Sequence, residues 1–134
     1  MAQTIKTLIK KNKLAFDSKF YIESLSLSYI LINKALKQVV KDHFKIALND
    51  HKLKTSDLIS QIKKEFIKNP GVKIRITKTA VRDIEYFLKL YKSLYKELKY
   101  QYPEKKIEDT ANLGISCLVI LNTSLIKIKN SAFN

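Results

Sequence analysis

The feature of this sequence that most clearly suggests a function is a row of basic residues with interleaved tyrosines. Such a row could bind a polyanion. Arg82, Lys89 and Lys96 stand seven residues apart, which places them two turns apart on one side of a helix. Lysines along a helix can follow a phosphate backbone, and tyrosines can stack on the bases of a single strand. The candidate nucleic-acid or anion-binding residues are Arg82, Tyr86, Lys89, Lys92, Lys96, Lys99 and Tyr100.

The same row has a simpler interpretation as a solvated helix face. Neighbours such as Glu85 and Lys89 are four residues apart and could pair locally.

The net charge of +14 attracts nucleic acids and acidic surfaces. However, all 26 basic residues except Arg75 and Arg82 are lysine, which an AT-rich coding sequence also produces, and arginine is the preferred partner of phosphates and bases. Both interpretations stay open.

No catalytic residue is predicted. The glycines, Gly71 and Gly114, form no phosphate-binding loop, and no Ser-His-Asp order is present. Cys117 lies in an apolar segment and is expected to be a small core residue. The carboxylates of residues 104–109 are explained by a helix N-terminus, where negative charge is favoured.

No metal or cofactor is predicted either. His43 follows Asp42 and His51 follows Asp50, and His with carboxylate can bind divalent ions. The two histidines are eight residues apart with no third ligand at helical spacing. A histidine near a helix C-terminus needs no ligand role, because the helix dipole already favours it.

Long helices must position these residues. A chain of 134 residues with two glycines and two prolines predicts one domain over 1–134, built from long elements. Apolar residues at helical spacing predict an all-α fold: a four-to-five-helix bundle with long antiparallel helices over 16–130, preceded by a lead-in helix within 1–15.

The helix boundaries follow from capping residues. Asp17 or Ser18 is expected to cap one long helix, or two in tandem, reaching about Leu48, in which the serines of 24–28 allow a close helix crossing. Residues 49–51 and 72–76 are expected to be loops. The other predicted helices begin after Thr55 or Ser56 and end before Asn69, run from Thr77 or Thr79 to Tyr102, and start between Pro103 and Asp109, the last being central to the bundle.

The sequence also carries expectations about compartment. The single Cys117 excludes an intramolecular disulfide, and the start of the chain lacks the apolar region of a secretory signal. The most apolar run, 113–121, is too short to cross a bilayer. A cytoplasmic protein with no membrane span is expected.

The order of features resembles the HEPN superfamily, bacterial four-to-five-helix bundles often found in toxin–antitoxin and defence systems, several of which are ribonucleases. The resemblance covers about residues 17–129 and rests on the segments 21–27 (YIESLSL), 33–37 (NKALK), 54–59 (KTSDLI) and 107–113 (IEDTANL).

This sequence departs from the family's functional signature, an Arg and a following His with four to six residues between them. Arg82 is followed by Asp83, but Phe87, Leu88 and Lys89 stand where the His would be. The resemblance therefore implies a degenerate, non-nucleolytic member.

Three functions remain in view. The first is a non-catalytic helical binding domain, dimeric or not, whose basic face contacts RNA or an acidic protein partner in a toxin–antitoxin or defence context. The second is a metal-independent ribonuclease of the HEPN type in which Arg82 holds the phosphate. The third is a structural dimerisation or interaction protein whose charge reflects codon usage.

Overall fold

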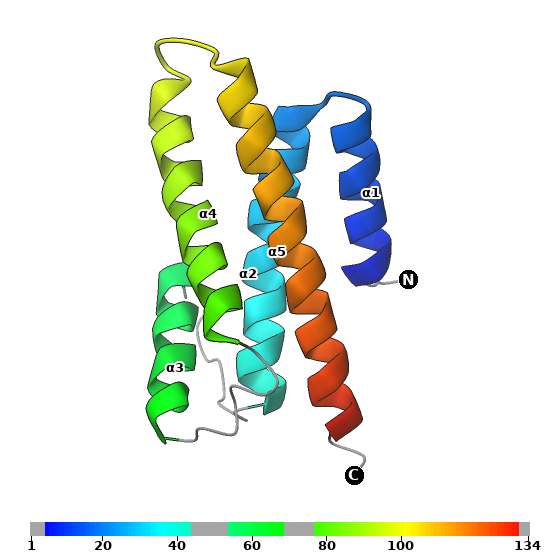
Figure 1. The fold of residues 1–134 in the computed structure, drawn as a ribbon, viewed down its shortest axis with the longest axis vertical. Helices are drawn as coiled ribbons and strands as arrows, with labels where there is room; N and C mark the ends of the chain where they lie inside the picture. The colour runs from blue at the N-terminus through cyan, green and yellow to red at the C-terminus, as the bar shows by residue number, and fades with distance from the viewer. Residues whose placement is uncertain (1–4, 44–53, 69–76, 132–134) are drawn as a thin grey trace.

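Five helices make up the part of the chain that the structure describes. The structure is a computed structural model that describes residues 5–43, 54–68 and 77–131, with side chains to Lys41 in the first range and to Ser124 in the last. The helices are α1 (Ile5–Asp17), α2 (Tyr21–His43), α3 (Thr55–Lys68), α4 (Lys78–Glu97) and α5 (Glu104–Ser131). No strand occurs in these ranges. The prediction of an all-α bundle is confirmed, and Figure 1 shows α4 antiparallel to both α3 and α5.

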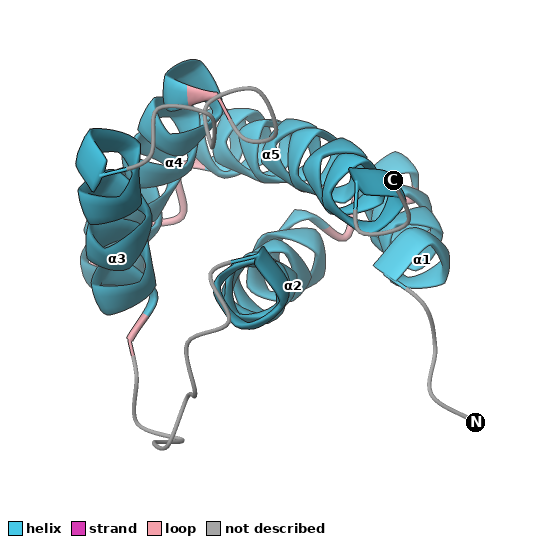
Figure 2. Cartoon of the chain, turned by 90° about the horizontal axis from the view of Figure 1, so that it is seen from below, coloured by secondary structure: helices cyan, strands magenta, loops and turns pink. Residues whose placement is uncertain are grey.

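The helices form a curved layer around α2. Figure 2 shows α3, α4, α5 and α1 in a row, with α2 inside the curve, where it packs against all four. The prediction that the last helix is the central one is therefore wrong. α5 packs chiefly on α2, α4 and α1, and Val119 and Ile120 on its outer side are 44% and 37% exposed. The apolar run of 113–121 covers more of the helix than its neighbours can bury.

The core is made of aliphatic side chains from every helix around α2. α2 buries Leu31, Ile32, Ala35, Leu36, Val39 and Val40, and α5 buries Ile107, Ala111, Leu118 and Leu121 against it. Phe87 of α4 is the largest fully buried side chain. Burial of apolar area of this kind is the main favourable term that holds helices together.

The turn between α1 and α2 differs from the predicted boundary. Asp17 is the last residue of α1 and does not cap α2. Lys19 has φ 68°, Lys19 N–H donates to Phe16 O and Phe20 N–H donates to Ala15 O, which is the hydrogen-bond pattern of a Schellman C-cap. Because glycine usually occupies this left-handed position, the lysine hid the helix end from sequence reasoning.

Small and polar residues bring α1, α2 and α5 close together, as the serines predicted. Asn12 of α1 is fully buried; its Nδ2 donates to Ser28 Oγ at 2.8 Å, and Ser24 Oγ donates to its Oδ1 at 2.6 Å. A Cβ at Gly114 would lie 2.7 Å from the Ser28 Cβ. α5 can therefore approach α2 at this point only with glycine at position 114.

The ends of α3 and α4 were predicted in part. Thr77 caps α4, its Oγ1 accepting a hydrogen bond from Ala80 N–H at 3.0 Å, as expected. α3 ends at Lys68, before Asn69. At its start, however, neither Thr55 nor Ser56 precedes the helix as a cap, because α3 begins at Thr55. Thr55 Oγ1 accepts a hydrogen bond from Asn33 Nδ2 at 2.7 Å, and the carboxylate of Asp57 accepts one from Lys54 N–H.

α4 is shorter than predicted. It ends at Glu97, with Leu98 as its C-cap, so the segment up to Tyr102 is a turn. The predicted helix end near Leu48 and the predicted loops at 49–51 and 72–76 lie outside the described residues.

Candidate nucleic-acid interface

The candidate binding residues all reach solvent. Arg82, Tyr86, Lys89, Lys92 and Lys96 lie in α4, and Lys99 and Tyr100 lie in the turn that follows it. Every one of these side chains is exposed, with Tyr86 at 56% and Tyr100 at 89%. The structure thus brings the predicted set to one side of α4 and its C-terminal turn.

The opposite side of α4 fixes this orientation. Its buried residues are Ala80, Val81, Ile84, Phe87, Leu88 and Leu94, which recur every three or four positions. Since a helix turns about 100° per residue, burial of this stripe forces the Arg82, Lys89 and Lys96 side chains outward. Phe87 is the largest fully buried side chain of this stripe.

A hollow lies on each side of this row, one toward α5 and one toward α3. Tyr86 lines a hollow toward α5 together with Pro103, Thr110 and Leu113. Lys89 and Lys92 line a hollow toward α3. We call the exposed set Arg82, Tyr86, Lys89, Lys92, Lys96, Lys99 and Tyr100 the α4 face.

The carboxylate four residues before Lys89 is engaged elsewhere. Glu85 pairs with Lys63 of α3, so the local Glu85–Lys89 pairing considered from the sequence does not form. Within the described residues, no cation of the α4 face takes part in an ion pair. These cations are consequently available to an external anion.

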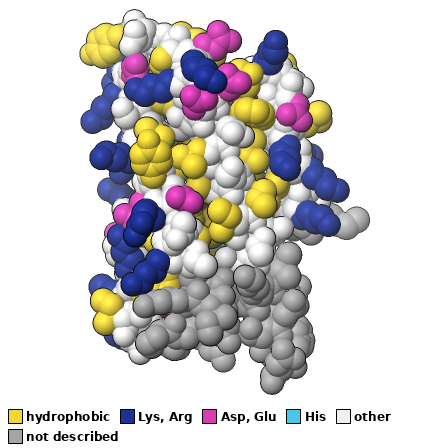
Figure 3. Space-filling view, viewed as in Figure 1, with side chains coloured by type: hydrophobic (Ala, Val, Ile, Leu, Met, Phe, Trp, Pro, Cys, Tyr) yellow, Lys and Arg dark blue, Asp and Glu magenta, His cyan; other side chains and the backbone are white. Residues whose placement is uncertain are grey.

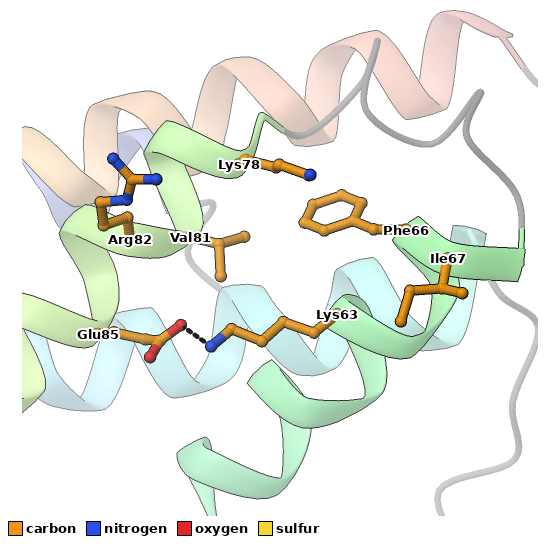
Figure 4. Close-up of a pocket in the computed structure, with 7 residues that line it drawn as sticks. All are labelled: Lys63, Phe66, Ile67, Lys78, Val81, Arg82 and Glu85. Atoms are coloured by element: carbon orange, nitrogen blue, oxygen red, sulfur yellow. Dashed lines mark ion pairs between the residues drawn. The ribbon is translucent and has the colours of Figure 1, made fainter.

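A basic groove between α3 and α4 was missed by sequence reasoning. Two hollows of about 670 Å³ and about 760 Å³ lie between the helices, and Lys63 and Glu85 line both of them. Figure 4 shows the Lys63–Glu85 ion pair crossing from α3 to α4 beside Phe66 and Val81. Lys54, Lys63 and Lys78 add to the cations here, and only the pairing of α3 with α4 reveals them as neighbours.

Charge is distributed unevenly over the molecule. Figure 3 shows basic side chains along the α3–α4 edge and acidic ones gathered at the end where α4 turns into α5. At that end Glu97 accepts hydrogen bonds from Lys106 Nζ at 2.8 Å and from Gln101 Nε2 at 2.7 Å. The bond from Lys106 is the main reason why the pKa of the Glu97 carboxyl is lowered.

The reactive side chains of the described region are positioned as core residues. Burial raises the pKa of the Cys117 thiol to about 12, so the thiolate needed for nucleophilic attack does not form near neutral pH. Burial also raises the pKa of Tyr91, whose ring stacks on Tyr29 with centroids 4.3 Å apart. The prediction that Cys117 is a small core residue is confirmed.

No group of three or more His, Cys, Asp or Glu side chains that could hold a metal ion occurs among the described residues. The His43 and His51 side chains lie outside them. In the same described ranges, none of the helices combines the length and apolar character needed to span a membrane.

Comparison with known proteins gives no relative: no family model, no curated protein and no solved structure matches this chain.

Proposed function

We propose that this protein is a non-catalytic binding domain that holds single-stranded RNA along the α4 face. The observation that carries the proposal is the row formed by Arg82, Lys89, Lys92 and Lys96. These four cations are exposed and make no ion pair within the described residues. They stand on a helix whose opposite side is buried in the core, which fixes the spacing of their backbone positions.

The dimensions suit a short stretch of single strand. Arg82 and Lys96 are separated by 14 residues, which is about 21 Å along a helix. Exposed tyrosines accompany the cations at Tyr86 and at Tyr100. A positively charged track with aromatic side chains beside it is the arrangement that binds single strands without sequence preference.

The site offers binding without an evident proton shuttle. Arg82 is the arginine of the α4 face, and no histidine lies in α4. Lysine and tyrosine titrate far from pH 7 and are poor general acids or bases there. We therefore favour attachment over RNA cleavage. On the resemblance to the HEPN superfamily, the proposal includes a role in a toxin–antitoxin or defence system.

The experiment that tests the proposal is a titration of labelled single-stranded RNA followed by fluorescence anisotropy. We compare Lys89→Glu/Lys92→Glu/Lys96→Glu with a control of equal net charge, Lys10→Glu/Lys11→Glu/Lys13→Glu, which alters exposed residues of α1. The α4 variant is expected to bind at least about tenfold more weakly, because each reversal removes a phosphate contact and adds repulsion. The α1 control is expected to stay within about threefold of wild type.

Equal losses in the two variants would mean that only bulk charge attracts RNA, and the proposal would fail. The bound RNA is also run on a denaturing gel. Specific cleavage that disappears in Arg82→Ala would instead support the ribonuclease hypothesis.

A further inference from the structure

We propose that the groove between α3 and α4 docks an acidic amphipathic helix of a protein partner. This adds a second ligand, at a groove that borders the α4 face, and it does not depend on whether RNA binds the α4 face.

The groove has the length of a short helix. Its two hollows, of about 670 Å³ and about 760 Å³, adjoin at the Lys63–Glu85 ion pair, whose residues line both. Along α4 the lining runs from Lys78 to Lys92, a distance of about 21 Å. A helical segment of about 14 residues spans the same length.

Apolar side chains line both hollows, alongside the ion pair that the two hollows share and polar side chains at the start of α3. Ile59 and Leu88 line one hollow, and Phe66 and Val81 line the other. Ile67 lines the second hollow as well and is 84% exposed. A helix that places apolar residues at three- and four-residue spacing against these side chains follows a common mode of peptide recognition.

The rims of the groove require an acidic partner. Their cations come from both helices and from the start of α3: Lys54, Lys63, Lys78, Arg82, Lys89 and Lys92. Among the described residues of the lining, the acidic one is Glu85, which is already paired with Lys63. Carboxylates on the two polar edges of a docked helix would complement this charge, which governs partner choice and association rate.

The aromatic residues argue for a helix over RNA in this groove. The exposed Tyr86 and Tyr100 line neither hollow. The aromatic residues that do are Phe66, which is buried, and Tyr29, which is stacked on Tyr91 at an interplanar angle of 14°. Bases of a single strand would find apolar aliphatic contacts here and no open stacking platform.

The two proposed ligands meet at shared cations. Arg82, Lys89 and Lys92 belong to the α4 face and also line the groove. Because one ammonium group cannot neutralise two ligands fully, a docked acidic helix is expected to weaken RNA binding. A partner of this kind would regulate the RNA-binding function.

The test uses two model peptides of about 14 residues and identical composition, rich in leucine and glutamate. One has leucines at helical spacing and the other is scrambled, which keeps the charge but removes the apolar stripe. At near-physiological salt the patterned peptide is expected to bind the full chain at least about tenfold more tightly than the scrambled one. Equal affinities would overturn the proposal, since charge alone would explain binding.

Variants separate the groove from the α4 face. Lys63→Glu/Lys78→Glu and, separately, Ile67→Ser are expected to weaken binding of the patterned peptide about tenfold and to leave RNA affinity within about threefold. Lys96→Glu, outside the groove, is expected to weaken RNA binding about tenfold and to leave the affinity for the patterned peptide within about threefold. Peptide binding that survives in both groove variants would overturn the docking site. Loss of RNA binding in the groove variant but not in Lys96→Glu would show that the groove is an RNA track, and would also overturn it.

Discussion

Asn12 is the residue on which the attachment of α1 depends. It is fully buried and joins α1 to α2 through Ser24 and Ser28. No buried side-chain nitrogen or oxygen in the described region lacks a partner. The network is therefore complete, and removal of its centre leaves two hydroxyl groups unsatisfied in the core.

We expect Asn12→Ala to lower the free energy of unfolding by about 2–4 kcal/mol, the cost of unpaired buried groups and a small cavity. Urea denaturation measures this value, with the exposed neighbour Lys13→Ala as the control. Asn12→Ala/Ser24→Ala/Ser28→Ala should recover part of the loss, because it removes the orphaned hydroxyls. A change in Asn12→Ala no larger than that of Lys13→Ala would show that the network contributes little.

Cys117 gives a pH-dependent prediction. Its pKa is raised from 9.0 to about 12, first by burial and second by the charge of Asp83. The unfolded thiol loses its proton before the folded one, so this residue's contribution to stability is complete below pH 9 and falls as the pH rises towards 12. Relative to Cys117→Ala, the wild type is expected to lose stability over that window.

A thiol reagent provides an independent check. At pH 8 the folded protein is expected to react at least about a hundredfold more slowly than the protein in urea, because little thiolate forms in the fold. Rapid reaction of the folded protein would contradict the position of Cys117 in the core.

At the scale of elements, the turn that joins α1 to α2 contains avoidable strain. Lys19 adopts φ 68°, a left-handed conformation that costs a residue with a Cβ about 1–2 kcal/mol. Glycine removes that cost but loses more conformational entropy on folding, by about 0.5–1 kcal/mol.

Lys19→Gly is accordingly expected to stabilise the protein by about 0.5–1 kcal/mol, the difference between these two effects. Lys13→Gly, within α1, should destabilise it by about 1 kcal/mol. Thermal unfolding of the two variants gives the comparison. Destabilisation by Lys19→Gly would mean that the lysine side chain, and not the backbone, matters at this turn.

Helix boundaries were predictable where a side chain signals them locally. Thr77 capped α4 as expected, and the serines of 24–28 marked a close crossing. The end of α1 was missed because lysine rarely occupies a left-handed cap. α5 was predicted to be central because of its apolar run. The apolar residues of a helix show how much of its surface could be buried, but the packing of the neighbouring helices decides how much is buried.

At the scale of the whole molecule, the α4 face was predictable and the groove was not. Periodicity within one helix is enough to place Arg82, Lys89 and Lys96 together. The Lys63–Glu85 pair joins residues of different helices, so no local pattern reveals it. The HEPN resemblance, the cytoplasmic location and the homodimer are tested by none of these observations and stay predictions.

The homodimer has one structural feature in its favour. Figure 3 shows hydrophobic side chains running over the α4–α5 side of the molecule, and Val119 and Ile120 are among the exposed residues of α5. Apolar patches on a helical surface commonly mark interaction sites.

The central claim, that the α4 face binds single-stranded RNA, is tested most directly by the salt dependence of RNA affinity. We compare Lys89→Gln/Lys92→Gln/Lys96→Gln with the matched control Lys10→Gln/Lys11→Gln/Lys13→Gln. Removing three phosphate contacts is expected to reduce the slope of log K against log salt by about 2, since each contact to a single strand contributes about 0.7. The slope is expected to fall for the α4 variant and to stay unchanged for the α1 control; equal slopes in wild type and both variants would contradict RNA binding at the α4 face.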